Sequence, residues 1–227
     1  MENYRLEGKT FVIDDYDRLP AFSSFLPGLA GVKGIPMWTF YTNRGQGMNS
    51  FGIDNKGNAI MEFNSANTAF ENTTVKGFRT FLKIDGEYYE PFFKYEKEAK
   101  RQIRMNKNSF KIIETNEKYG IEVTVNYFIL PNESIGALVR QVSVKNISDS
   151  AKDIEVIDGL PKIITYGISN GEFKEMSNLF KSWAYIKNID NKVPYYTLRA
   201  STKDSAEVSD VEGGYYYLTI KDGELQD

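Results

Sequence analysis

The sequence contains neither cysteine nor histidine. The absence of cysteine excludes a disulfide-stabilised scaffold, a thiolate nucleophile and a cysteine-ligated zinc site. The absence of histidine excludes a Ser-His-Asp triad and any acid or base catalysis by an imidazole. Proton transfer or nucleophilic attack by this chain would therefore depend on carboxylates, tyrosine, lysine, serine or threonine.

The sequence also lacks an excess of positive charge and a long hydrophobic run. There are 28 basic and 31 acidic side chains, which gives a formal charge of -3. Proteins that bind nucleic acid or anionic membranes carry a basic surplus, so we expect neither partner. No segment approaches the roughly 20 apolar residues of a membrane-spanning helix. Residues 1–7 are polar and acidic where a signal peptide needs a basic start, so we expect a cytoplasmic protein.

The dominant pattern in the 227 residues is an alternation with period two, which is typical of β-strands. It is clearest over 121–129, where apolar residues alternate with Glu122, Thr124 and Asn126, and a polar turn joins this segment to a second strand at 109–115. The other predicted strands form pairs at 77–84 and 88–93, 48–53 and 59–63, and 136–146 and 152–157, with further strands at 195–201 and 214–221.

One segment has helical spacing instead. Ser169 and Glu172 have the spacing of a capping box, so the helix is expected to begin at Ser169. Its apolar face would consist of Phe173, Met176, Leu179, Phe180, Trp183 and Ile186.

Many antiparallel strands with short turns and one late helix predict a mainly β protein, a large antiparallel β-sandwich. No linker interrupts the chain, so 1–227 is treated as one domain, with 201–213 as its most prominent loop. Residues 221–227 resemble a turn that needs a returning strand, which suggests truncation at the C-terminus.

The strongest candidate site is the stretch 25–47, where glycine and proline lie among large apolar side chains. It contains Trp38 and the directional hydrogen-bonding groups of Asn43, Arg44 and Gln46, which are the groups that sugar hydroxyls need. The alternative is structural, because an arginine in a β-protein more often binds carbonyl groups or acids. These four residues are nevertheless our first candidates for substrate contact.

A second polar cluster lies at 62–68, where Asn64 and Asn67 could present amides to a sugar or simply cap a turn. Acidic pairs such as Asp14 with Asp15 do not by themselves indicate the two carboxylates of a glycosidase, so no catalytic residue is assigned. The basic stretch 94–107 predicts a solvated or partner-facing strand edge, since lysine often guards such edges.

Several motifs resemble the N-terminal region of glycoside hydrolase family 94 phosphorylases, and within that family the 1,2-β-oligoglucan phosphorylases. The resemblance covers nearly the whole chain. It rests on SFLPGLAG at 24–31, GIPMW at 34–38, NRGQG at 43–47, SFGI at 50–53, MEFNSAN at 61–67, ISNGEFKEM at 168–176 and LRAST at 198–202.

The resemblance implies a galactose mutarotase-like supersandwich that a helical linker joins to an (α/α)6 barrel. In such enzymes an aspartate of the barrel protonates the glycosidic oxygen while inorganic phosphate attacks the anomeric carbon with inversion. The barrel would begin after residue 227, so this chain would lack the general acid and the phosphate site. The resemblance therefore implies a non-catalytic region without metal or cofactor, which supports the barrel, contacts β-glucan oligosaccharide weakly or within the full enzyme, and can take part in a homodimer.

Two alternatives remain open. A free-standing carbohydrate-binding module would stack aromatic rings on sugar faces and would bind glycan as the isolated chain. A complete mutarotase-type enzyme is disfavoured, because that chemistry uses imidazole in the proteins that give the fold its name. A sandwich that normally supports a barrel should expose an apolar patch where the barrel would sit.

Overall fold

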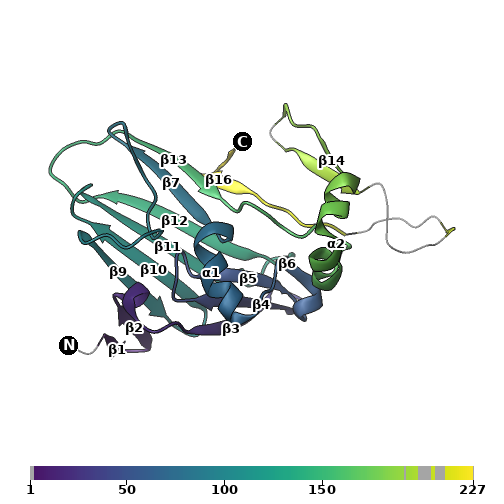
Figure 1. Ribbon diagram of the computed structural model, residues 1–227, viewed down its shortest axis with the longest axis horizontal. Helices are drawn as coiled ribbons and strands as arrows, with labels where there is room; N and C mark the ends of the chain where they lie inside the picture. Colours follow the sequence, from purple (N-terminus) through teal and green to yellow (C-terminus); the bar gives the residue numbers. More distant parts are fainter. Residues whose placement is uncertain (1–2, 192, 199–205, 208–212, 227) are drawn as a thin grey trace. The chain divides into compact units, whose positions relative to one another are not determined.

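The computed structural model describes residues 3–191, 193–198, 206–207 and 213–226 (Figure 1). The protein is mainly β, and its sheets are antiparallel. The chain, treated above as one domain, divides into two compact units, Met1–Ile163 (unit 1) and Ile164–Asp227 (unit 2). The predicted loop 201–213 falls almost entirely outside the described residues.

Three sheets build unit 1. The six-stranded sheet has the order β1 (Tyr4–Glu7), β2 (Thr10–Asp14), β9 (Ala99–Met105), β10 (Ser109–Asn116), β11 (Ile121–Ile129) and β12 (Leu138–Asn146). The four-stranded sheet consists of β3 (Ser23–Ala30), β4 (Ile35–Thr42), β5 (Met48–Ile53) and β6 (Ala59–Met61). The three-stranded sheet has the order β13 (Ile154–Gly159), β7 (Arg79–Ile84) and β8 (Glu87–Tyr89). Unit 1 also contains two short 3-10 helices, η1 (Tyr16–Arg18) between β2 and β3, and η2 (Lys56–Asn58) between β5 and β6.

The core of unit 1 lies between its sheets. Every second residue is buried in β10, and in β11 from Ile121 to Tyr127, which is the alternation expected when one face of a strand packs on a core. The buried cluster includes Ile112 and Val123 of the six-stranded sheet, Met48 of the four-stranded sheet and Leu82 of the three-stranded sheet. The predicted β-sandwich is therefore confirmed.

Three predicted hairpins are confirmed and one is wrong. The pairs β10 with β11, β7 with β8, and β5 with β6 all form. The predicted hairpin between 136–146 and 152–157 does not form, because β12 pairs with β11 while β13 pairs with β7 of another sheet. The polar turn between them carries the chain from one sheet to another instead of reversing it within a sheet.

The basic stretch 94–107 is also placed differently from the prediction. Its strand β9 is not an edge, because it pairs with β2 on one side and β10 on the other. Lys100 is exposed on one face, whereas Arg101 points into the core and is only 5% exposed. Alternation along the strand thus separates charges that look like one solvated run in the sequence.

The structure contains an α-helix that the sequence did not predict, α1 (Ala66–Lys76). It begins within the polar cluster 62–68. Its sequence is rich in asparagine and threonine, which have low helix propensity. Among its residues only Ala69 and Thr73 are buried, so no apolar stripe marks it in the sequence.

Unit 2 contains α2 (Asn170–Trp183) and two short hairpins, β14 (Ala184–Lys187) with β15 (Tyr195–Leu198), and β16 (Thr219–Lys221) with β17 (Glu224–Gln226). The predicted capping box is confirmed, since the Glu172 amide donates to Ser169 Oγ at 3.2 Å and the Ser169 amide donates to Glu172 Oε2 at 2.8 Å. Ile186, expected on the helix, lies on β14 and is exposed. No helix in the described residues has the length and hydrophobicity needed to cross a membrane.

Candidate aromatic site and buried polar networks

Four aromatic rings gather on the side of the β3–β6 sheet that faces away from the core: Phe25, Trp38, Phe40 and Phe63, here called the aromatic face. Phe25 is opposite Phe40 in the register of β3 and β4, and their ring centroids are 4.9 Å apart. Phe63 meets Trp38 edge to face at 5.7 Å. Such offset and edge-to-face pairs are the favoured aromatic arrangements. Phe25 is 51% exposed whereas Phe40 is only 5% exposed, so the face is open to solvent at Phe25 and closed at Phe40.

The indole of Trp38 is held in place by the turn after β5. Its Nε1 donates a hydrogen bond to the carbonyl oxygen of Asn55 at 3.2 Å. Gly52 lies opposite Trp38 on β5, and a Cβ atom there would come within 2.8 Å of Trp38 Cζ2. Glycine therefore leaves the space that the indole occupies, and the ring is fixed before any ligand arrives.

Beside the indole lies an open depression of about 400 Å³, a volume in the range of small-molecule sites. Its lining is apolar except for one acid, and consists of Gly28, Leu29, Pro36, Met37, Trp38 and Asp54. Among the six predicted contact residues, Trp38 alone lines this depression. This combination of a fixed aromatic ring, apolar walls and a single polar group is typical of ligand sites.

Asn43, in contrast, is fully buried and uses its side chain inside the protein. Its Oδ1 accepts from the Phe22 amide at 2.9 Å, and its Nδ2 donates to the carbonyls of Tyr16 and Pro20 at 2.9 and 3.0 Å. The guanidinium of Arg44 donates to the carbonyl of Asn43 at 2.7 Å and to that of Leu19 at 3.1 Å. Both side chains hold the segment around η1 against the end of β4, which is the structural alternative stated above.

Gln46 belongs to a second buried network, which connects all three sheets of unit 1. Its Nε2 donates to Thr80 Oγ1 at 2.9 Å, and its Oε1 accepts from Arg140. Thr80 donates in turn to Asp158 at 2.6 Å, and Arg140 forms an ion pair with Asp158. Burial lowers the pKa of Arg140, but the Tyr127 hydroxyl and the Asp158 carboxylate outweigh it and raise that pKa overall.

The two asparagines of the second polar cluster lie apart from the depression lining. Asn64 is half-buried, and its Nδ2 points back to the carbonyl of Glu62 at 3.4 Å. Asn67 is exposed in the first turn of α1. Neither lines the depression beside Trp38.

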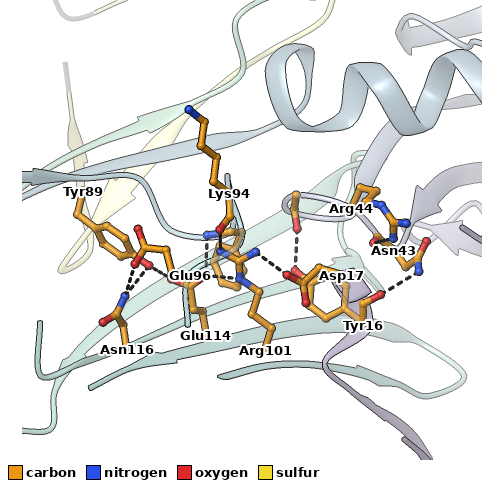
Figure 2. Close-up of polar contacts among 12 residues, drawn as sticks. Tyr16, Asp17, Asn43, Arg44, Tyr89, Lys94, Glu96, Arg101, Glu114 and Asn116 are labelled. Atoms are coloured by element: carbon orange, nitrogen blue, oxygen red, sulfur yellow. Dashed lines mark hydrogen bonds and ion pairs between the residues drawn. The ribbon is translucent and has the colours of Figure 1, made fainter. Parts of the chain in front are cut away.

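The structure also contains a buried acid network that was not expected (Figure 2). Glu114 of β10, fully buried, accepts hydrogen bonds from Arg101 Nε at 2.6 Å, from the Phe92 amide at 2.7 Å and from the Tyr89 hydroxyl. Arg101 also donates to Asp17 at 2.8 Å. A charge that is removed from water requires such partners.

The same network holds the segment between β8 and β9. Arg101 Nη2 donates to the Lys94 carbonyl at 2.5 Å, and Asn116 Nδ2 donates to Glu96 at 3.0 Å and to the Tyr89 hydroxyl at 2.9 Å. Burial, followed by the charge of Glu114, raises the pKa of Tyr89. For Arg101, burial lowers the pKa, but Glu114, Tyr16 and Asp17 together raise it above its ordinary value.

A signal for this pair exists in the sequence pattern. Glu114 has the same parity as the buried residues Phe110 and Ile112 of β10, and Arg101 has the same parity as Ile103 of β9. The register places Glu114 directly opposite Arg101. An acid and a base at inward positions of neighbouring strands therefore predict a buried pair, provided that the strand order is known.

Both buried networks have a structural role. Glu114 has three donors and no exposed surface on its side chain, so a substrate has no access to it. Within the described residues, no three acidic side chains lie close enough together to hold a metal ion.

No protein-family model matches the chain, and the search of curated proteins finds no similar sequence.

Proposed function

We propose that this chain is the non-catalytic β-sandwich region of an enzyme similar to β-glucan phosphorylases, and that its aromatic face contacts glycan. The observation that carries the proposal is the fixed indole of Trp38 at the wall of an open depression. The apolar C–H faces of pyranose rings stack on aromatic rings, and a ring that is already immobile loses little entropy on binding. Catalysis would take place in a helical barrel outside these residues, in a cytoplasmic enzyme that can be a homodimer.

The resemblance to the phosphorylases and the distribution of exposed apolar side chains support the scaffold part of this proposal. Leu29 and Val32 of the β3–β4 hairpin are 68% and 73% exposed, and Phe25, on the same strand as Leu29, is 51% exposed. Clusters of exposed apolar groups mark interaction sites on soluble proteins. A barrel domain that packed against the tip of this hairpin would cover Val32, and Leu29, which lines the depression, would stay at the boundary, where a glycan could reach it.

The test is calorimetric titration of the purified chain with β-1,2-linked glucose oligosaccharides. The same sample is assayed for phosphate release from glucose 1-phosphate with an oligosaccharide acceptor. We expect binding without turnover, and a loss of at least about tenfold in affinity for Trp38→Ala, which corresponds to about 1.4 kcal/mol. Tyr88→Ala is the matched control, because Tyr88 is 82% exposed on β8 and does not line the depression.

Each result has a separate meaning. Turnover would contradict a non-catalytic role. Absence of binding, or equal losses for Trp38→Ala and Tyr88→Ala, would contradict glycan contact through the aromatic face. The second candidate function, a free-standing carbohydrate-binding module, rests on the same indole. It would be favoured if the isolated chain bound several β-glucan linkages with similar affinity and retained that affinity for long polymers.

A further inference from the structure

The turn after β5 positions an acid next to the Trp38 indole. Asp54 has a left-handed backbone with a φ of 58°, and its amide donates to the carbonyl of Pro36 on β4 at 3.0 Å. The following residue, Asn55, accepts the hydrogen bond from Trp38 Nε1. One turn thus fixes both the indole and the backbone of Asp54, so their spacing does not depend on a ligand.

The carboxylate of Asp54 is exposed, and it makes no ion pair or side-chain hydrogen bond with the part of the chain that the structure describes. Of the six residues that line the depression, Asp54 is the single charged one. An ionised carboxylate accepts hydrogen bonds and donates none. It would therefore bind a ligand rich in hydroxyl groups and would repel a ligand with a phosphate or carboxylate beside it.

We propose that the depression is a subsite for one neutral hexopyranose unit, with the ring stacked on Trp38 and two neighbouring hydroxyl groups donating to Asp54. This inference rests on the proposed function and narrows it, because it assigns one sugar unit of the glycan to Trp38 and Asp54. Leu29, Pro36 and Met37 supply the apolar walls, and the volume of about 400 Å³ accommodates one ring with part of the next. Glucose 1-phosphate, an anion, is excluded from this subsite.

The experiment compares two ligands, the β-1,2-linked glucose disaccharide and glucose 1-phosphate, by NMR titration of the whole chain. Two variants separate the contributions of Asp54. Asp54→Gly removes the side chain but suits the left-handed backbone, and Asp54→Asn keeps the shape but removes the charge. Asp222→Gly, at an exposed residue of unit 2 with a φ of 54°, is the matched control.

We expect the native chain to bind glucose 1-phosphate at least about tenfold more weakly than the disaccharide. Asp54→Gly should lose about tenfold in disaccharide affinity, since hydrogen bonds to a charged group are lost. Asp54→Asn should reduce the discrimination against glucose 1-phosphate to less than about threefold. Asp222→Gly should leave both affinities unchanged.

Unchanged disaccharide affinity in Asp54→Gly, or equal binding of the two ligands by the native chain, would overturn the subsite. If Trp38→Ala still abolished glycan binding in that case, the proposed function would stand without Asp54. If the native chain bound no glycan at all, the proposed glycan contact would fail, and the subsite with it.

Discussion

Replacing Glu114 by glutamine tests whether its buried pair with Arg101 stabilises unit 1. Glutamine has the same shape, and its amide oxygen can still accept the hydrogen bonds that Phe92 and Arg101 donate to Oε2. Its amide nitrogen would then face the hydroxyl of Tyr89, whose proton loses its acceptor. The substitution therefore removes one negative charge and one hydrogen bond, and it leaves the guanidinium buried.

The size of the effect follows from the burial of the two groups. The side chains of Arg101 and Glu114 are 4% and 0% exposed, so water cannot replace the missing charge. Removing one partner of a buried ion pair costs about 3–5 kcal/mol. Asp17 remains 2.8 Å from Arg101 and offsets part of this loss, so we expect the free energy of unfolding to fall by about 3 kcal/mol. At a urea dependence of about 2 kcal/mol per molar, the midpoint falls by about 1.5 M.

Equilibrium urea unfolding, followed by far-UV circular dichroism and tryptophan fluorescence, measures this change. Glu117→Gln is the control, because Glu117 is 65% exposed and pairs with the exposed Lys100, so its urea midpoint should stay close to that of the native chain. In an Arg101→Met background, the further loss caused by Glu114→Gln should shrink, because the buried cation is absent. A midpoint shift below about 0.3 M, or equal losses in both backgrounds, would refute the reasoning.

Three further predictions concern stability. Burial raises the pKa of Tyr16 well above its ordinary value of 10.0. The free energy of unfolding is therefore retained below about pH 10, and above that pH it falls by about 1.4 kcal/mol per pH unit, because the unfolded chain loses the proton that the folded chain keeps. Urea titrations at about pH 9 and about pH 11 detect this slope, and Tyr16→Phe should reduce it. Asn43→Ala should cost about 2–3 kcal/mol in urea unfolding, because the buried Asn43 side chain makes three hydrogen bonds to the backbone of Tyr16, Pro20 and Phe22. The exposed Asn67→Ala should cost less than about 0.5 kcal/mol, and equal losses would contradict the structural role of Asn43. Ser169→Ala should destabilise α2 by about 1 kcal/mol, seen as faster hydrogen exchange of its first-turn amides, and unchanged exchange would rule out the cap.

Local signals in the sequence are sufficient for the elements that depend on local structure. The β7–β8 turn has Asp85 and Gly86 with φ values of 50° and 91°, a conformation that these residue types tolerate. The α2 start at Ser169 likewise depends on a contact within one helical turn. Pairing between distant segments has no such signal. The turn after β12 looks like a hairpin turn, yet β13 pairs with β7, and the choice between sheets depends on the completed core.

In the candidate site, too, the sequence indicates the type of chemical group, whereas the partner of each group depends on the completed fold. The residue types at 38–46 indicated hydrogen bonding, but not whether the partners were sugar hydroxyls or backbone carbonyls. Asn43 and Gln46 point into unit 1, because the end of β4 and the turn that follows it are covered by other segments of the chain. Asp54 lies in the turn between two predicted strands and was not predicted as a contact residue, because only the folded turn brings it to the depression that Trp38 also lines.

The order β1-β2-β9-β10 has a consequence for synthesis of the chain on the ribosome. Ile13 of β2 pairs with Ile103 of β9, 90 residues later, so the first hairpin emerges long before its neighbour exists. At 5–20 residues per second, it waits for roughly 5–20 s. During that time the hairpin exposes Val12 and Ile13, which are buried in the finished fold. It also exposes Leu6 and Phe11, which remain exposed after folding. The nascent hairpin is thus a segment that chaperones would bind, and high contact order makes folding of unit 1 slow.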